Sequence, residues 1–348
     1  MTKSTTRETA DIAGVVGKNA IINGNFDIWQ RATSQTATGY GSDDRWFNIL
    51  NGSTQVVSRQ AFALGQTDVP NNPKYYSRTV VSSVAGVSNY AIKIQKIEGV
   101  ETFAGTTATL SFWAKADANK NIAIEFAQSF GTGGTNPAPS ANVLGIGVTT
   151  VALTTSWVKH TVSVAVPSIS GETIGTDGND FLTLIFWLDA GSNYNARTNS
   201  LGQQSGTFEF SQVQMEAGSV ATEFEPRSVG EELALCQRYF QKNYNQNAFA
   251  GTAITQFTNQ SSHGRANTGI IGSVSVFPVT MRGSPTLVVY DKAGTSNRCA
   301  IYAVNGTQVN GMTINQQRAT DNSVMVRVIG VSGGAAGISY MYTVNAEL

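Results

Sequence analysis

Three predicted strands carry aromatic and charged side chains on the face opposite to their apolar residues. Successive side chains of a strand point to opposite faces, so the alternate Leu, Ile, Phe and Ala residues of 110–115, 122–128 and 181–189 mark the faces that enter a core. The other faces then carry Trp113, Lys115, Glu125, Trp187 and Asp189.

Together these residue types have the chemistry of a sugar-binding surface. The C–H face of a sugar ring stacks on an indole, while its hydroxyl groups pair with carboxylate, amide or ammonium groups. If the three strands are neighbours in one sheet, the side chains converge in one groove, and the loop residues Tyr194 and Asn195 rim it. The competing interpretation is that loops or a neighbouring subunit cover both Trp rings, because a bare face with two Trp is unusual.

The sequence offers little support for catalysis. The two histidines, His160 and His263, are isolated, and no zinc-protease, nucleophile-elbow, phosphate-loop or zinc-like Cys/His motif occurs. Glycosidase chemistry needs two carboxylates on opposite sides of the scissile bond, and no motif among the 23 acidic residues identifies such a pair. We therefore expect a binding protein rather than an enzyme, with a glycan-cleaving enzyme as the least favoured alternative.

Composition narrows the class of partner. The net charge of the 348 residues is +0 and the Lys and Arg residues form no block, which argues against binding nucleic acid or an anionic membrane. The longest apolar stretches have the length of a strand, well short of the ~20 residues that span a bilayer, so membrane insertion is not expected. Cys236 and Cys299 suggest neither a metal knuckle nor a disulfide framework, which fits assembly in a reducing cytoplasm.

Short period-2 segments separated by Gly-, Asn- and Pro-rich loops predict a mainly β fold. Residues 1–19 show no apolar period and are expected to form an extended arm. We expect a jelly-roll β-sandwich at 20–227, a linking helix at 228–245 and a second, small β-sandwich domain at 246–348.

A capping box, Ser228 with Glu231, predicts where the linking helix begins. Its apolar stripe has 4-3-4 spacing, so the helix must pack against another element. That element is either its own domain or the same helix of other subunits in a short trimeric seam, because heptads share this spacing. The stripe consists of Val229, Leu233, Cys236 and Phe240.

Several segments resemble, in order, a family of phage and prophage tail-fibre-like proteins. The opening pair is NAIINGNFDIWQRATS (19–34) and GYGSDDRWF (39–47), and the central strands are QKIEGVETFAGTTATLSFWAKA (95–116). TTSWVKHTVSVAVPSISGETIGTDGNDFLTLIFWL (154–188) resembles the later strands of the family. FSQVQMEAGSVATEFEPRSVGEELALCQRYF (210–240) is the most distinctive, because it joins the last strand to the capped helix.

The resemblance implies a carbohydrate-binding-module-like jelly roll followed by a small β-domain, in a virion protein that attaches to a host-surface glycan. It also implies a homotrimer, assembled in the host cytoplasm, whose N-terminal arm docks to other virion proteins. Related modules hold a structural Ca²⁺ with oxygen ligands, for which Asn25, Asp27 and Glu216 are the candidates. No other cofactor is expected.

A purely structural virion role is the main alternative. A head fibre, decoration or collar component would bury the Trp-bearing face between subunits instead of exposing it to a receptor. Attachment requires Trp113 or Trp187 to be exposed in a groove, whereas an enzyme requires two carboxylates across a cleft.

Overall fold

The computed structural model describes residues 18–255, 260–261, 270–303, 308–329 and 335–348, in two compact units. Unit 1 comprises Met1–Val229 with Leu348, and unit 2 comprises Gly230–Glu347. Nearly all of the expected N-terminal arm lies outside the described residues. In the described part of the chain, no helix is long and apolar enough to cross a membrane.

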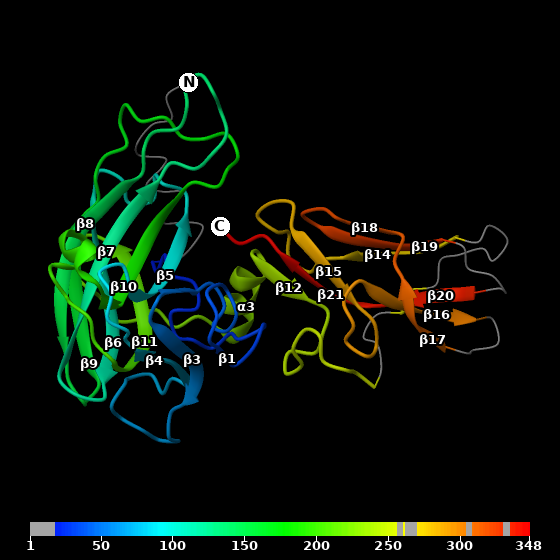
Figure 1. Cartoon of the computed structure of the whole chain (residues 1–348), viewed down its shortest axis with the longest axis horizontal. Helices are drawn as coiled ribbons and strands as arrows, with labels where there is room; N and C mark the ends of the chain where they lie inside the picture. Colours follow the sequence, from blue (N-terminus) through cyan, green and yellow to red (C-terminus); the bar gives the residue numbers. More distant parts are fainter. Residues whose placement is uncertain (1–17, 256–259, 262–269, 304–307, 330–334) are drawn as a thin grey trace. The chain divides into compact units, whose positions relative to one another are not determined.

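Unit 1 is a β-sandwich of two antiparallel sheets (Figure 1). Sheet A has six strands in the order β1 (Ser34–Gln35), β3 (Thr54–Ala61), β4 (Tyr75–Ser82), β11 (Gly206–Ala217), β6 (Thr107–Ala116) and β9 (Val158–Ala165). Sheet B has five, in the order β2 (Phe47–Asn51), β5 (Tyr90–Glu98), β10 (Phe181–Ala190), β7 (Lys120–Ser129) and β8 (Val143–Leu153). Many successive strands alternate between the two sheets, as in a jelly roll.

The strand alternation places the core where the sequence predicts it. On β10 the residues Leu182, Leu184, Phe186 and Leu188 are fully buried between the sheets, and the predicted core residues of β6 and β7 join the same cluster. The mainly β prediction is confirmed, because the period-2 pattern reports which side of a strand faces a core.

A buried cation lies in the interior of unit 1. The Lys93 side chain on β5 is fully buried and ion-pairs with Asp43, whose carboxylate also accepts a hydrogen bond from Ser77 Oγ at 2.9 Å. The Lys93 ammonium lies 5.6 Å from the ring centroid of Trp46 and 5.7 Å from that of Phe26. Burial lowers the pKa of Lys93, and the neighbouring Asp43 opposes that shift by stabilising the charged form.

The two opening segments of the resemblance meet around this pair. Asn23 Nδ2 donates to the carbonyl oxygens of Ile28 and Asp44 at 2.9 and 3.0 Å, and the Trp46 indole N–H donates to the carbonyl of Asn23 at 3.1 Å. The Asp44 carboxylate accepts from both the backbone and the side-chain nitrogen of Gln30. Buried hydrogen bonds therefore fix the parts of segments 19–34 and 39–47 that lie outside the strands, while Ser34 pairs with β3 and Phe47 with β5.

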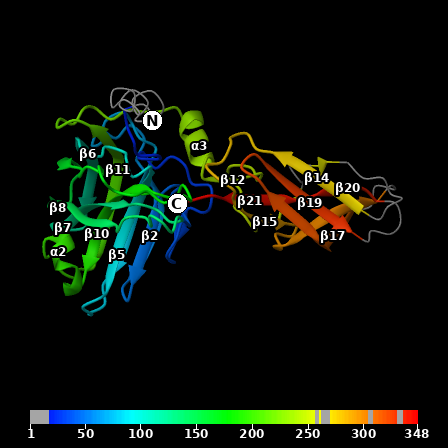
Figure 2. The same ribbon diagram turned by 90° about the horizontal axis from the view of Figure 1, so that it is seen from above.

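Unit 2 consists of three small sheets (Figure 2), with one main hydrophobic cluster and a smaller one at Tyr244, Ala300 and Met341. The sheets have the orders β12–β21–β15, β13–β20–β16–β17 and β14–β19–β18. Their bounds are β12 (Phe240–Lys242), β13 (Gln260–Ser261), β14 (Ile270–Val276), β15 (Thr286–Tyr290), β16 (Arg298–Ala303), β17 (Gln308–Thr313), β18 (Gln316–Ala319), β19 (Ser323–Ile329), β20 (Ala335–Ser339) and β21 (Met341–Asn345).

The linking helix is shorter than predicted. Helix α3 spans Val229–Gln237, and Phe240 begins strand β12, which pairs with β21, so the prediction of one helix through 245 is wrong. Val229 is exposed and Leu233 partly buried, whereas Cys236 and Phe240 are covered by the chain itself. The four residues therefore do not form one helical stripe, and a trimeric seam built on all of them is excluded.

Replacing Lys93 by Met is expected to lower the free energy of unfolding by about 3–5 kcal/mol, because Asp43 keeps a buried charge without its counterion. Urea unfolding followed by tryptophan fluorescence measures the change. The double variant Lys93→Met/Asp43→Asn should recover much of the loss. A double variant as unstable as Lys93→Met would show that the pair is not the cause.

Candidate functional site

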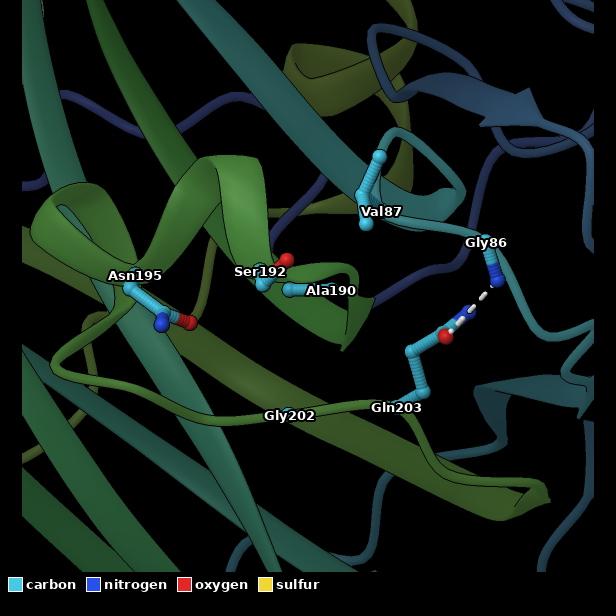
Figure 3. Close-up of a pocket in the computed structure, with 7 residues that line it drawn as sticks. All are labelled: Gly86, Val87, Ala190, Ser192, Asn195, Gly202 and Gln203. Atoms are coloured by element: carbon cyan, nitrogen blue, oxygen red, sulfur yellow. Dashed lines mark hydrogen bonds between the residues drawn. The ribbon is translucent and has the colours of Figure 1, made fainter.

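A polar crevice of about 350 Å³ lies at the end of sheet B, between two loops (Figure 3). One loop connects β4 to β5, and the other follows β10 through the short helices η1 (Ser192–Tyr194) and α2 (Asn195–Thr198). The lining residues are Gly86, Val87, Ala190, Ser192, Asn195, Gly202 and Gln203. Small-molecule sites have volumes of roughly 300–1,000 Å³, so the crevice fits a ligand of the size of one sugar.

Backbone hydrogen bonds hold the two loops together. Gly191 N donates to the Asn89 carbonyl at 2.7 Å, and Asn193 N donates to the Val87 carbonyl at 3.0 Å. A Cβ on Gly191 would lie 2.4 Å from the carbonyl oxygens of Gly86 and Val87, so the close approach requires glycine. Main-chain contacts therefore hold the two walls of the crevice together.

Gln203 crosses from one loop to the other. Its Oε1 accepts from Gly86 N at 3.0 Å (Figure 3), and its Nε2 donates to the Val84 carbonyl at 2.6 Å. Ser192 and Asn195, which lie with Gln203 in the segment between β10 and β11, are exposed. The lining thus combines amide and hydroxyl groups with the apolar surfaces of Val87 and Ala190.

Asp189 lies beneath the crevice and is fully buried. Its carboxylate accepts hydrogen bonds from Ser53 Oγ at 2.6 Å, Ser83 Oγ at 2.9 Å and Gln204 N at 2.8 Å. A register shift between Trp187 and Asp189 in the pairing of β10 with β5 turns the carboxylate towards these donors. Asp189 was predicted to face outward as a ligand-binding group. That prediction is wrong, since the carboxylate holds the surrounding loops.

Three aromatic rings lie beside the crevice on the outer face of sheet B. The ring centroid of Tyr194 is 5.1 Å from that of Trp187 and 5.1 Å from that of Tyr90. Trp187 is 1% exposed, so it offers no face to a sugar, whereas Tyr90 and Tyr194 are partly exposed. Burial and the neighbouring Tyr194 raise the pKa of Tyr90, which keeps its phenol protonated at neutral pH.

Glu125 accepts the hydrogen bond of the buried Trp187 indole. Its carboxylate accepts from the Trp187 indole N–H at 2.9 Å, from Arg197 Nε at 2.7 Å and from Gly145 N at 2.7 Å. The Arg197 guanidinium also lies 5.1 Å from the Trp187 ring centroid. Trp187 and Glu125 are therefore parts of a closed network within one chain, and the prediction that they face a ligand directly is wrong.

Trp113 and Lys115 lie on the other sheet. Both are on the outer face of β6 in sheet A, whereas Glu125, Trp187 and Asp189 belong to β7 and β10 of sheet B. The condition for one shared groove, that the three strands are neighbours in one sheet, is therefore not met, because alternation defines the two faces of each strand but not the sheet it joins. Of the six predicted glycan-binding residues, Tyr194 lies next to the crevice with a partly exposed ring.

The predicted metal ligands have protein partners. Asn25 Nδ2 donates to Asp27 Oδ2 at 2.8 Å, and burial raises the pKa of Asp27. Glu216 accepts from Thr222 N and Thr222 Oγ1 and from Gln214 Nε2, at distances of 2.7–3.0 Å. The described residues contain no group of three or more His, Cys, Asp and Glu side chains that could hold a metal ion.

The sequence reasoning missed most of the crevice. It placed Tyr194 and Asn195 at the rim of a site from their position in a polar loop, but gave no role to Gly86, Val87 or Gln203. Gly86 and Val87 lie about 100 positions before the loop that carries Ser192, and Gln203 lies 117 positions from its partner Gly86. A short turn with Gly and Ser is also an unspecific signal.

Solved structures give distant likenesses to the sandwich. A search of protein-family models finds no match, and a search of curated proteins finds none. A structure described as a CBM4 module is 16% identical, covering 56% of this chain and 98% of its own, with a TM-score of 0.30. A family 11 carbohydrate-binding module from Clostridium thermocellum is 11% identical, covering 54% of this chain and 98% of its own, with a TM-score of 0.31.

A phage protein is similar to the same degree. The enzymatically active domain of tailspike protein 4 from bacteriophage CBA120 is 13% identical, covering 57% of this chain and 21% of its own, with a TM-score of 0.32. At TM-scores below 0.5 these likenesses decide neither a ligand nor a role. Function must therefore be argued from the geometry of this chain.

Replacing Asp189 by Asn is expected to lower the free energy of unfolding by about 2 kcal/mol, because hydrogen bonds to a charged acceptor are worth roughly 1.5–3 kcal/mol. The amide nitrogen of Asn would also face one of the present donors. Chemical unfolding measures the loss. Asp177→Asn is the control, since its carboxylate accepts from Thr132 Oγ1 on an exposed loop and its loss should stay within ~0.5 kcal/mol. Equal losses would contradict a supporting role for Asp189.

Proposed function

We propose that this chain is a fibre or tail protein of a bacteriophage virion, which attaches to the host surface by binding a neutral carbohydrate in the crevice of unit 1. The observation that carries the proposal is the crevice itself, in which amide and hydroxyl side chains and a small apolar surface converge beside partly exposed tyrosines. The sequence resemblance to tail-fibre-like proteins supports the virion role.

The lining has the chemistry of a sugar site. Asn195 and Gln203 offer amide donors and acceptors, and the Ser192 hydroxyl offers both in one group. Val87 is 60% exposed and presents an apolar surface to the C–H groups of a ring. The described lining residues carry no ionised side chain, so the crevice favours a neutral polyhydroxyl ligand over a charged one.

The positions of the carboxylates support binding without cleavage. Glycoside hydrolysis needs two of them facing the scissile bond, ~5–9.5 Å apart. The described residues that line the crevice include no Asp or Glu. Asp189 and Glu125, which lie near it, are each fully buried and accept three hydrogen bonds from the protein.

A homotrimer docked to the virion through the N-terminal arm would repeat the crevice three times. Each shallow site would bind weakly, and linkage would raise the overall affinity without any new contact. The competing structural role required a neighbouring subunit to cover the Trp-bearing face. Trp187 is covered by its own chain, so it gives that alternative no support.

The double variant Ser192→Ala/Asn195→Ala is expected to weaken binding to host polysaccharide at least about fivefold, because each lost hydrogen bond to a ligand costs about 0.5–1.5 kcal/mol. Both side chains are exposed, so stability should stay within ~0.5 kcal/mol of the wild type. Isothermal titration calorimetry with host-derived oligosaccharides measures the affinity. The matched control is Thr155→Ala/Ser170→Ala, two exposed residues of other loops. Unchanged affinity of the crevice variant would refute this site.

The purified chain is expected to reduce adsorption of a phage that carries it, because soluble protein occupies the same receptors. Adsorption to intact host cells is measured as free plaque-forming units with increasing wild-type protein or crevice double variant. Inhibition by the wild type but not by the variant supports attachment through the crevice. No inhibition by wild-type protein that binds the cells would assign the chain to a structural virion role.

A further inference from the structure

The outer face of sheet A carries a second cluster of aromatic and charged side chains, none of which lines the crevice. Here it is called the sheet A platform and consists of Tyr76, Arg78, Trp113, Lys115, Trp157 and Glu209. Arg78 on β4, Glu209 on β11 and Lys115 on β6 lie in one row across three adjacent strands, since Glu209 is the register partner of both cations.

The aromatic part of the platform is partly open to solvent. Trp157 packs edge-on against Tyr76, with ring centroids 5.3 Å apart, and remains partly exposed. Trp113, two positions from Lys115 on the same face of β6, is partly exposed as well. The Trp187 indole N–H donates to Glu125. The indole N–H groups of Trp113 and Trp157 donate to no described residue, and neither is buried. Both rings can therefore stack against a ligand and donate to it.

The charged part of the platform has an excess of positive charge. Glu209 is 5% exposed, and its carboxylate accepts from Arg78 Nε at 2.6 Å and contacts Lys115 Nζ at 3.1 Å. The two cations are more open, with side-chain exposures of 35% for Arg78 and 29% for Lys115. One inward carboxylate thus orients two outward cations, which leaves one net positive charge facing solvent.

The Lys115 ammonium also lies 5.3 Å from the Trp157 ring centroid. A ligand that stacks on this ring would bring any acidic substituent within reach of the ammonium and the neighbouring guanidinium. Arginine recognises carboxylate and phosphate alike, since its planar donors match both. The neutral crevice has no such groups, so the two surfaces select different ligands.

We propose that the sheet A platform binds an anionic polysaccharide, with a sugar ring stacked on Trp157 or Trp113 and its carboxylate or phosphate group paired with Lys115 and Arg78. The charge complementarity of the platform carries this inference, which is independent of ligand binding in the crevice. Because the platform is a partly open row rather than a pocket, it suits a polymer that presents the same charge repeatedly.

The test is binding of the full-length chain to immobilised polygalacturonate, poly(glycerol phosphate) and dextran, measured by biolayer interferometry at two salt concentrations. Because the crevice is itself proposed to bind a neutral sugar, the platform is tested in the crevice variant Ser192→Ala/Asn195→Ala. For this variant we expect binding to at least one acidic polymer, weakened by salt, and none to dextran. The two acidic polymers separate a carboxylate ligand from a phosphate ligand. Equal binding to all three, or binding to dextran alone, would overturn the proposal, as would no binding to either acidic polymer.

Lys115→Gln is expected to weaken binding to the acidic polymer about three- to fivefold, the effect of one partly exposed ion pair. Trp157→Ala is expected to weaken it about tenfold through lost stacking. Glu209→Gln should instead strengthen binding, because it releases both cations, an effect that a purely structural role would not produce. Lys292→Gln, a partly buried lysine of unit 2, removes the same charge and should leave binding unchanged.

Two further controls separate the alternatives. The crevice variant Ser192→Ala/Asn195→Ala should retain binding to the acidic polymer, so failure of one site is distinguished from failure of the other. Light scattering reports the oligomeric state of each platform variant. If Lys115→Gln and Trp113→Ala dissociate an oligomer, the platform is a contact between copies of the chain and the proposal is overturned.

Discussion

One buried cation constrains how the two sheets of unit 1 close. Lys93 faces the interior from β5, where an uncompensated ammonium would cost several kcal/mol. Its counterion, Asp43, comes from the loop before β2 and is also held by Ser77 on β4, in the opposite sheet. The pair is satisfied only when loop, sheet A and sheet B have met, so it selects one arrangement of the sandwich.

A second buried carboxylate supports the end of the sandwich where the crevice lies. Asp189 on sheet B accepts from Ser83, just beyond β4 of sheet A, and from Ser53, in the turn between β2 and β3. In both places a buried carboxylate joins segments that the hydrophobic core alone would leave loosely placed. Directional hydrogen bonds fix the conformation of these loops, because apolar packing has little preference for one loop conformation over another. The crevice can therefore be polar and shallow while its walls remain fixed.

Alternation in the sequence was enough to predict the faces of β10 and β7, but not the pairing of strands. Leu184 and Phe186 enter the core as predicted, whereas Trp113 and Trp187 lie on different sheets. Which strands become neighbours depends on contacts between residues far apart in sequence, which a period-2 pattern does not encode. The assignment of Phe240 to the helix was wrong for a related reason. Its 4-3-4 spacing fits a helix, but its backbone pairs with β21 as the first residue of strand β12.

The outward tryptophans show why residue type alone cannot separate a binding surface from a structural one. The indole N–H of Trp187 donates to Glu125 and its ring packs against Tyr194, so neither the N–H nor the ring face is available to a ligand. Trp157 packs against Phe62 and Tyr76, with the Lys115 ammonium over its ring, and still keeps part of its surface in water. The difference arises from a loop helix lying over one ring and not over the other. What distinguishes a ligand-binding indole is therefore unsatisfied hydrogen-bonding capacity together with remaining exposure, two quantities that exist only after the chain has folded.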